Sequence, residues 1–162
     1  MENELENSEQ ATRQIIVFKM GGEEYALDIQ HIKEVVPTPP VSKVPLTPDY
    51  ILGVANIRGN ILAIVDLEIK FQLQKTHANP QESYALVVEM ADINMAFLVN
   101  EIPNTFSVPI ASIDQSPAIL QEATGQKSYI DGIVKLEDRL IILIDIQSIV
   151  SKGDIQAVVP PT

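Results

Sequence analysis

Residues 50–67 decide the fold, and they read Tyr50-Ile51-Leu52-Gly53-Val54-Ala55-Asn56-Ile57-Arg58-Gly59-Asn60-Ile61-Leu62-Ala63-Ile64-Val65-Asp66-Leu67. Two apolar runs, Val54–Ile57 and Ile61–Leu67, lie on either side of the polar sequence Arg58-Gly59-Asn60. Short runs rich in Val and Ile are typical of β-strands, and a short connection that contains glycine is typical of a hairpin. The stretch therefore predicts two antiparallel strands joined by a tight turn.

Three further pairs of apolar runs repeat this design. They are Ile15–Met20 with Glu24–Ile29, Tyr84–Met90 with Met95–Val99, and Ile130–Leu136 with Leu140–Ile146. Ile and Val together number 37, against 17 for Leu and Met, and branching at Cβ favours a pleated surface over a helix. These observations predict an all-β protein, built as a barrel or a sandwich.

The chain also resembles itself at an offset of 79 residues, which aligns Tyr50 with Tyr129. In the same ungapped register, Ile61–Leu67 matches Leu140–Ile146. A unit of about 60–70 residues buries too little apolar surface to be stable alone. The repeat therefore predicts two copies of one small β unit that pack against each other.

The polar stretch Gln74–Glu82, which contains Pro80, is the natural boundary between the copies. We expect one domain in residues 13–150, with a first β-barrel in about residues 13–75 and a second in about 82–150. Residues 1–12 are acidic and polar, and residues 151–162 carry Pro160-Pro161 and little periodicity. Both ends are predicted to be tails, the first of them disordered.

Helix is predicted to be sparse. Five prolines lie within Pro37–Pro48, and this density predicts an extended crossover because proline suits neither a helix interior nor a central strand. Short helical segments are expected in Gln30–Val35, Leu67–Leu73, Gln115–Gly125 and Ile146–Val150.

Composition and charge exclude several classes of function. The chain carries 11 basic and 22 acidic side chains, a net charge of -11, which disfavours binding to nucleic acid or to an anionic membrane surface. It has no cysteine, which excludes disulfides, thiol nucleophiles and thiolate metal sites. No apolar run approaches the roughly 18–20 residues that span a bilayer, and the acidic N-terminus is no secretory signal. We expect a cytoplasmic protein without direct membrane insertion.

The search for catalytic residues returns little. His31 and His77 have no partner at metal-ligand spacing, so neither a metal nor a cofactor is expected. Asp66 and Asp145 occupy equivalent positions in the two copies, which raises the alternative of an aspartic-protease-like dyad. Each is followed by an apolar residue at the end of an apolar run, whereas that chemistry needs a tight turn, so both are predicted to cap strand ends or helices. The sequence favours a protein that is not an enzyme.

Arg58 is the strongest functional candidate that the residues themselves offer. It lies at a predicted hairpin tip, between Ile57 and Gly59, in an otherwise apolar neighbourhood. The second copy has Glu137-Asp138 at the matching turn, so the first hairpin differs in a way that its fold does not require. Glu34 is the acid best placed to pair with Arg58 if residues 30–36 pack on the same lobe.

These residues resemble the CheW family of bacterial chemotaxis coupling proteins. Gly53-Val54-Ala55-Asn56-Ile57-Arg58-Gly59, followed by an apolar strand that ends Val65-Asp66-Leu67, is similar to the family signature. Glu34-Val35-Val36, the proline-bearing crossover and the last hairpin agree in order, so the likeness covers about residues 14–150. The resemblance implies two SH3-like five-stranded β-barrels packed together with a few short helices.

The resemblance also implies a function. It points to a non-enzymatic adaptor that links the cytoplasmic tip of a chemoreceptor, a methyl-accepting chemotaxis protein, to the regulatory domain of the histidine kinase CheA, within a membrane-associated receptor array. An adaptor of a twitching-motility or other chemosensory-like pathway is the alternative. The receptor-coupling residues carried over are Glu34, Asn56, Arg58, Gly59, Ile32, Val36 and Val99. The kinase-binding residues carried over are Val41, Val44, Ile51 and Gly53.

Overall fold

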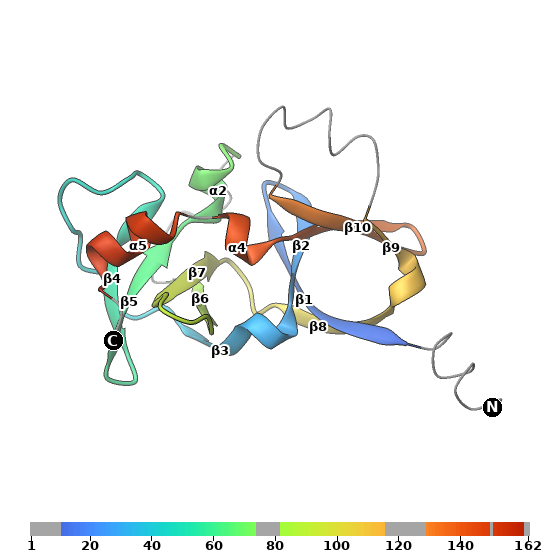
Figure 1. Cartoon of the computed structure of the whole chain (residues 1–162), viewed down its shortest axis with the longest axis horizontal. Helices are drawn as coiled ribbons and strands as arrows, with labels where there is room; N and C mark the ends of the chain where they lie inside the picture. The colour runs from blue at the N-terminus through green and yellow to red at the C-terminus, as the bar shows by residue number, and fades with distance from the viewer. Residues whose placement is uncertain (1–10, 74–81, 116–128, 150, 161–162) are drawn as a thin grey trace.

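The computed structural model describes residues 11–73, 82–115, 129–149 and 151–160, and most of their regular structure is β-strand (Figure 1). Two sheets account for it. Sheet A has the strand order β8 (Asn104–Pro109), β1 (Thr12–Met20), β2 (Glu23–Asp28), β11 (Arg139–Ile144), β10 (Ile130–Leu136) and β9 (Ile113–Asp114). Sheet B has the order β3 (Ile32–Pro37), β6 (Tyr84–Val88), β7 (Met95–Val99), β5 (Asn60–Val65) and β4 (Ile51–Ile57).

The four predicted hairpins and the all-β class are confirmed. β1 pairs with β2, β4 with β5, β6 with β7 and β10 with β11, each antiparallel. Short helices complete the described chain: η1 (Ile29–His31), α2 (Leu67–Lys70), η3 (Ile110–Ser112), α4 (Ile146–Ile149) and α5 (Lys152–Val158). The predicted helices after residues 66 and 145 therefore form as α2 and α4.

The internal repeat is confirmed at the level of single hydrogen bonds. The bounds of β4, β5 and α2 recur 79 residues later as those of β10, β11 and α4. Both hairpins have a register shift before their glycine, Gly53 in one and Gly132 in the other. The N–H of Asp66 donates to the carbonyl of Tyr50 over 2.8 Å, and the N–H of Asp145 donates to that of Tyr129 over 2.9 Å.

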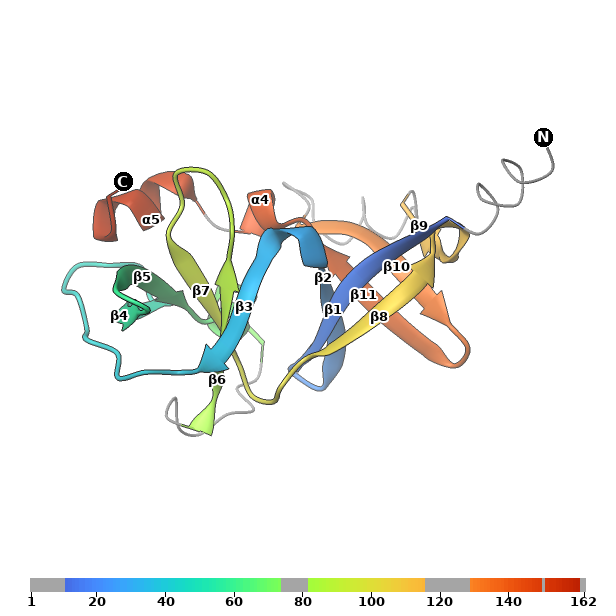
Figure 2. The ribbon, with the colours of Figure 1, turned by 90° about the horizontal axis from the view of Figure 1, so that it is seen from below.

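The predicted assignment of one barrel to residues 13–75 and the other to 82–150 is wrong. Sheet A takes β1 and β2 from the first copy and its other strands from the second, whereas sheet B takes β3, β4 and β5 from the first copy and β6 and β7 from the second. The chain leaves β2 through η1 and crosses to sheet B, where β3 pairs with β6; likewise it leaves β7 and crosses to sheet A, where β8 pairs with β1 (Figure 2). The copies are interlocked, and sheet A has a sixth, two-residue strand.

Two local predictions also need correction. Only Ile29–His31 is helical in the segment 30–35, because Asp28 caps a single turn and the β-branched residues that follow pair with β6 as β3. The predicted C-terminal tail instead contains α5, whose first turn is capped by the Ser151 hydroxyl. At the other end, β1 begins at Thr12 and residues 1–10 lie outside the described chain, as does nearly all of Gln115–Gly125.

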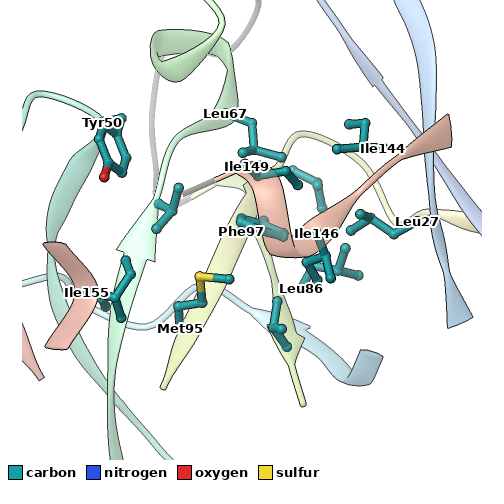
Figure 3. Packing of buried hydrophobic residues seen from close by; sticks show 14 of the residues in the cluster. Leu27, Tyr50, Leu67, Leu86, Met95, Phe97, Ile144, Ile146, Ile149 and Ile155 are labelled. Carbon is teal, nitrogen blue, oxygen red and sulfur yellow. The ribbon is translucent and has the colours of Figure 1, made fainter. Parts of the chain in front are cut away.

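The main core lies where the two sheets meet. Its buried side chains come from both sheets and from the helices α2, α4 and α5 (Figure 3). Phe97 of β7 and Leu86 of β6 lie beside Leu27 of β2 and Ile146 of α4 in this cluster, and all four are at most 3% exposed. The sheets are therefore joined by a continuous apolar interior.

Helix α5 is fastened to the body by buried and polar contacts. Ile155 is fully buried, the Tyr50 hydroxyl donates to an Asp154 carboxylate oxygen over 2.7 Å, and Gln156 donates to the carbonyl of Asp92 over 2.9 Å. Burial and the neighbouring Asp154 carboxylate raise the pKa of Tyr50, so the hydroxyl stays a donor. Lys70 lies 4.4 Å from the centre of the Tyr50 ring, which adds a cation–π contact.

We predict that Ile155→Ala lowers the free energy of unfolding by about 2–5 kcal/mol, because it leaves a cavity at a fully buried position. Urea unfolding followed by circular dichroism measures the change. Ala157→Ser, at an exposed position of the same helix, is the control and should stay within about 0.5 kcal/mol of the parent. Equal stability of Ile155→Ala and the parent would show that α5 does not belong to the fold.

Candidate functional site

The β4–β5 hairpin ends in a turn of two residues, Arg58 and Gly59. Their φ angles are +53° and +84°, and positive φ at both positions is what a type I′ turn requires. The Asn56 side-chain oxygen accepts a hydrogen bond from the Gly59 N–H over 2.9 Å. Asn56 and Gly59 therefore shape the turn, and Arg58 is the side chain that the turn presents.

Glu34 and Arg58, whose pairing the sequence left open, form an ion pair in the structure. Arg58 Nε donates to both Glu34 carboxylate oxygens, over 2.8 Å and 2.7 Å. β3 and β4 are the two outer strands of sheet B, so this contact joins opposite edges of the curled sheet. The Arg58 side chain is 70% exposed and the Glu34 side chain 22%, which leaves the guanidinium anchored at one side and open to solvent at the other.

A recess of about 210 Å³ lies beside this ion pair. Its rim is charged and includes Lys33, Glu34, Arg58 and Glu89, whereas buried aliphatic side chains from strands β4, β5 and β6 lie beneath: Ile57, Leu62, Val87 and Val88. A recess of this kind can take a partner's side chain while the charged rim sets its position.

Sheet A has a larger recess, of about 510 Å³, beside the β10–β11 hairpin, which is the repeat equivalent of the β4–β5 hairpin. It lies between the β1–β2 hairpin, the β7–β8 loop and the tip of β10–β11, and it too has an ion pair. Arg139 Nε donates to Glu24 over 3.1 Å, and Arg139 Nη2 also bonds to this carboxylate. The Arg139 guanidinium lies 5.0 Å from the centre of the Phe106 ring, and its hydrogen bonds lower the pKa of Glu24.

The other carried-over receptor-coupling residues are less exposed. Ile32 and Val36 of β3 are partly buried and pack against the apolar clusters of the two faces of sheet B. Val99 of β7 is only 2% exposed, in the main core. A direct contact between Val99 and a partner would therefore need this part of the core to open, and its receptor-coupling role stays a prediction.

The carried-over kinase-binding residues also include both partly exposed and buried positions. Val41 and Val44 are partly exposed in the loop between β3 and β4, but Ile51 is 4% exposed and belongs to the core. Ser42 pairs with Val54 through two backbone hydrogen bonds of 2.8 Å and 2.9 Å, and this pairing crosses directly over Gly53. A Cβ on Gly53 would lie 2.1 Å from the Ser42 carbonyl oxygen, so the absence of a side chain at Gly53 lets the loop pack against β4.

Leu46 is a surface residue that the sequence reasoning missed. It is fully exposed at the tip of the proline-rich loop, with φ at +62°. The Thr47 hydroxyl donates to the Val44 carbonyl over 3.1 Å and fixes the loop beside it. The sequence did carry a signal for this exposed residue: an apolar side chain lies between Pro45 and Pro48 in the predicted crossover.

The two repeat-equivalent aspartates are capping residues. Asp66 accepts from the N–H of Ile69 over 3.2 Å at the start of α2, which confirms the predicted cap. Asp145 accepts from the N–H of Gln147 over 3.1 Å and from the Ser148 hydroxyl over 2.9 Å. Among the described residues, no group of three or more His, Asp or Glu side chains is placed to hold a metal ion, and no helix has the length and apolarity to cross a membrane.

The interlocked β-sheets and the hairpin site together define a small β scaffold, and comparison with known proteins identifies its class. The family model of the CheW-like domain matches residues 14–154, so the chain belongs to the CheW family. The chain is 34% identical to the chemotaxis protein CheW of Helicobacter pylori, over 86% of this chain and 82% of that one, and 30% identical to that of Bacillus subtilis, over 90% and 92%. The crystal structure of the scaffolding protein TtCheW from Thermoanaerobacter tengcongensis matches with a TM-score of 0.71, 29% identity and coverage of 83% and 85%.

We predict that Gly53→Ala destabilises the protein by more than about 1 kcal/mol, because alanine is strained at a φ of +151° and its methyl group meets the Ser42 backbone. Chemical unfolding measures the loss. Gly153→Ala is the matched control: only Ser151 Oγ, at 3.6 Å, lies near its added Cβ, and alanine in helix α5 should stabilise by about 0.5–1 kcal/mol. Equal effects of the two substitutions would contradict the role given to Gly53.

The lowered pKa of Glu24 predicts a pH dependence. A carboxylate whose pKa falls on folding stabilises the protein above its unfolded pKa of about 4.3 and loses that contribution as pH falls through the folded value. Arg139→Gln should therefore lower stability at pH 7, and the difference from the parent should vanish in acid. Urea midpoints between pH 7 and about pH 3 measure it. A difference that stays constant over this range would rule out the ion pair as its source.

Proposed function

We propose that this chain is a non-enzymatic adaptor that couples a chemoreceptor to the histidine kinase CheA. The observation that carries the proposal is the Glu34–Arg58 pair at the rim of the sheet B recess, in a chain that belongs to the CheW family. Relatives named chemotaxis protein CheW, and a solved structure named as a scaffolding protein, support a scaffold role in chemotaxis. The adaptor is proposed to be cytoplasmic and to join receptor arrays at the membrane.

The receptor tip is proposed to dock at the recess beside Arg58. Apolar burial supplies most of the binding energy at such interfaces, and a central arginine often supplies orientation. Nε of Arg58 is already engaged by Glu34, so the side chain is oriented before a partner arrives. An oriented arginine loses less entropy on binding than a free one.

The kinase regulatory domain is proposed to dock at the loop between β3 and β4. Val41, Val44 and Leu46 are the partly or fully exposed apolar side chains there, and the hydrogen bonds between Ser42 and Val54 hold the loop against the sheet. The receptor and kinase sites then lie at different parts of the same sheet. A shift in receptor state needs only a few kcal/mol of differential binding to reach the kinase.

An adaptor of a twitching-motility or other chemosensory-like pathway is the second candidate. The Glu34–Arg58 recess would serve either role, because it identifies no particular receptor. The genes that neighbour this one, and the kinase whose regulatory domain binds the purified protein, separate the two.

We predict that Arg58→Ala weakens binding to the receptor tip at least tenfold while binding to the CheA regulatory domain is retained. Leu46→Asp should show the converse. Both side chains are exposed, so neither change should lower the free energy of unfolding by more than about 1 kcal/mol. Calorimetric titration with the two partners from the same genome measures both affinities.

A charge exchange tests the pair itself. Glu34→Lys should lose receptor binding, and combining it with Arg58→Glu should restore part of it if the two side chains act as a unit. Arg139→Ala is the matched control, since it removes an arginine from the equivalent hairpin of the other copy. If Arg58→Ala and Arg139→Ala bind the receptor tip alike, the receptor site is wrong; if no variant or parent binds either partner, the adaptor function itself fails.

A further inference from the structure

Helix α5 contacts the base of the loop that leads into β4. Tyr50 is the last residue before that strand, and its hydroxyl donates to an Asp154 carboxylate oxygen over 2.7 Å. Tyr50 is only 7% exposed and lies with Ile155 at one end of the main core (Figure 3). The N–H of Ile51 donates to the Pro48 carbonyl over 3.0 Å, so the end of the loop is fixed directly beside this tyrosine.

The same helix contacts the turn between β6 and β7. The Gln156 side-chain amide donates to the Asp92 carbonyl over 2.9 Å, and Lys152 Nζ lies 3.7 Å from an Asp92 carboxylate oxygen. Within this turn, the N–H of Ile93 donates to the Met90 carbonyl over 3.3 Å. Met90 and Ile93 also line the recess of sheet B. Helix α5 therefore reaches the wall of that recess.

The two contacts leave α5 on opposite sides. Successive residues of a helix point about 100° apart, so Asp154 and Gln156 point in nearly opposite directions. Between them in the sequence lies Ile155, which is fully buried in the main core. A short helix with a buried anchor thus connects the base of the β3–β4 loop to the turn that borders the recess.

The second copy separates the contact with α5 from the needs of the hairpin. The Tyr129 carbonyl accepts the N–H of Asp145 just as the Tyr50 carbonyl accepts the N–H of Asp66. The Tyr129 ring packs against Phe71, with ring centres 5.5 Å apart. Both tyrosines serve the backbone in the same way, so the bond between Tyr50 and Asp154 belongs to the α5 contact and not to the repeat.

We propose that α5 is a brace through which the kinase-binding loop and the receptor-binding recess influence each other. A partner that orders one surface restrains α5, so the second partner has less motion to remove and binds more tightly. The effect is reciprocal, because each partner changes the affinity of the other by the same factor. These surfaces are docking sites only under the proposed function, so the coupling of the partners rests on that proposal, whereas the brace itself does not.

The brace is tested without a partner, by amide hydrogen exchange of the full chain followed by NMR. The Ile51 amide reports on the loop end of α5 and the Ile93 amide on the recess end. Gln156→Ala should speed exchange at Ile51 by about two- to tenfold, which is the equivalent of one hydrogen bond. Tyr50→Phe should do the same at Ile93. Each effect is read at the end of the helix that was not altered, and Tyr129→Phe, the matched control, should change neither rate.

The amides of the β1–β2 pair in sheet A report on global stability and should exchange at the parent's rate in all three variants. If exchange changes only at the altered end of α5, the two ends are independent and the brace is refuted. If exchange rises equally in sheet A, the variants have lost global stability and the brace is refuted as well.

The coupling is tested by calorimetric titration of the CheA regulatory domain into the chain, alone and saturated with a receptor cytoplasmic tip. The bound tip should tighten kinase binding at least about fivefold in the parent and in Tyr129→Phe. The ratio should fall below about twofold in Tyr50→Phe and Gln156→Ala, since each loses one contact of α5.

The outcomes separate this proposal from the proposed function. If both partners bind but the ratio is the same in the parent and the three variants, α5 carries no coupling and the proposal is refuted, while the adaptor function stands. If the parent binds neither partner, the adaptor function fails and the coupling falls with it, and the exchange rates at Ile51 and Ile93 still decide whether α5 is a brace.

Discussion

The pairing of β3 with β6 is the contact on which the rest of the structure depends. It carries the chain from sheet A to sheet B and supplies an outer strand that the first copy cannot pair by itself. A register shift between Ile32 and Glu34 re-aims the side chains at that point, as bulges do near functional sites. Because the sheet curls, Glu34 then meets Arg58 from the opposite edge. The Glu34–Arg58 pair is thus also the contact that joins the edges of the sheet.

Local sequence patterns were sufficient to predict much of the fold. The pairing of Glu34 with Arg58, which lie 24 residues apart, was left open by the sequence, whereas each hairpin, the repeat and the cap at Asp66 follow from turn residues and periodicity. The interlocking of the copies does not, because two equivalent hairpins offer the same edges and nothing in a short window says which strand crosses. Helix α5 was missed since a single fully buried residue, Ile155, anchors it beside a glycine.

Burial explains where the functional assignments were too broad. Val99 lies in β7, where every residue is buried, so its continuous apolar run has no alternation that would separate a surface valine from a core one. Ile51 is a core-facing position of β4, where buried and partly exposed residues alternate. Gly53 is a different case: the proximity of the Ser42 carbonyl leaves no room for a side chain, so a substitution there would displace the loop that carries Ser42. Exposed residues and the buried residues that hold them in place are mixed within a few positions of each other.

The turn that presents Arg58 has a thermodynamic consequence. An L-residue with a side chain is disfavoured in the left-handed region by roughly 1–2 kcal/mol, and glycine is not. Arg58 has a φ of +53° there, and most of its side chain is in water, so little burial offsets that cost. Selection for stability alone would put glycine or asparagine at this position. The protein is therefore expected to be less stable than its own fold permits, because glycine or asparagine at position 58 would meet the same turn geometry with less strain.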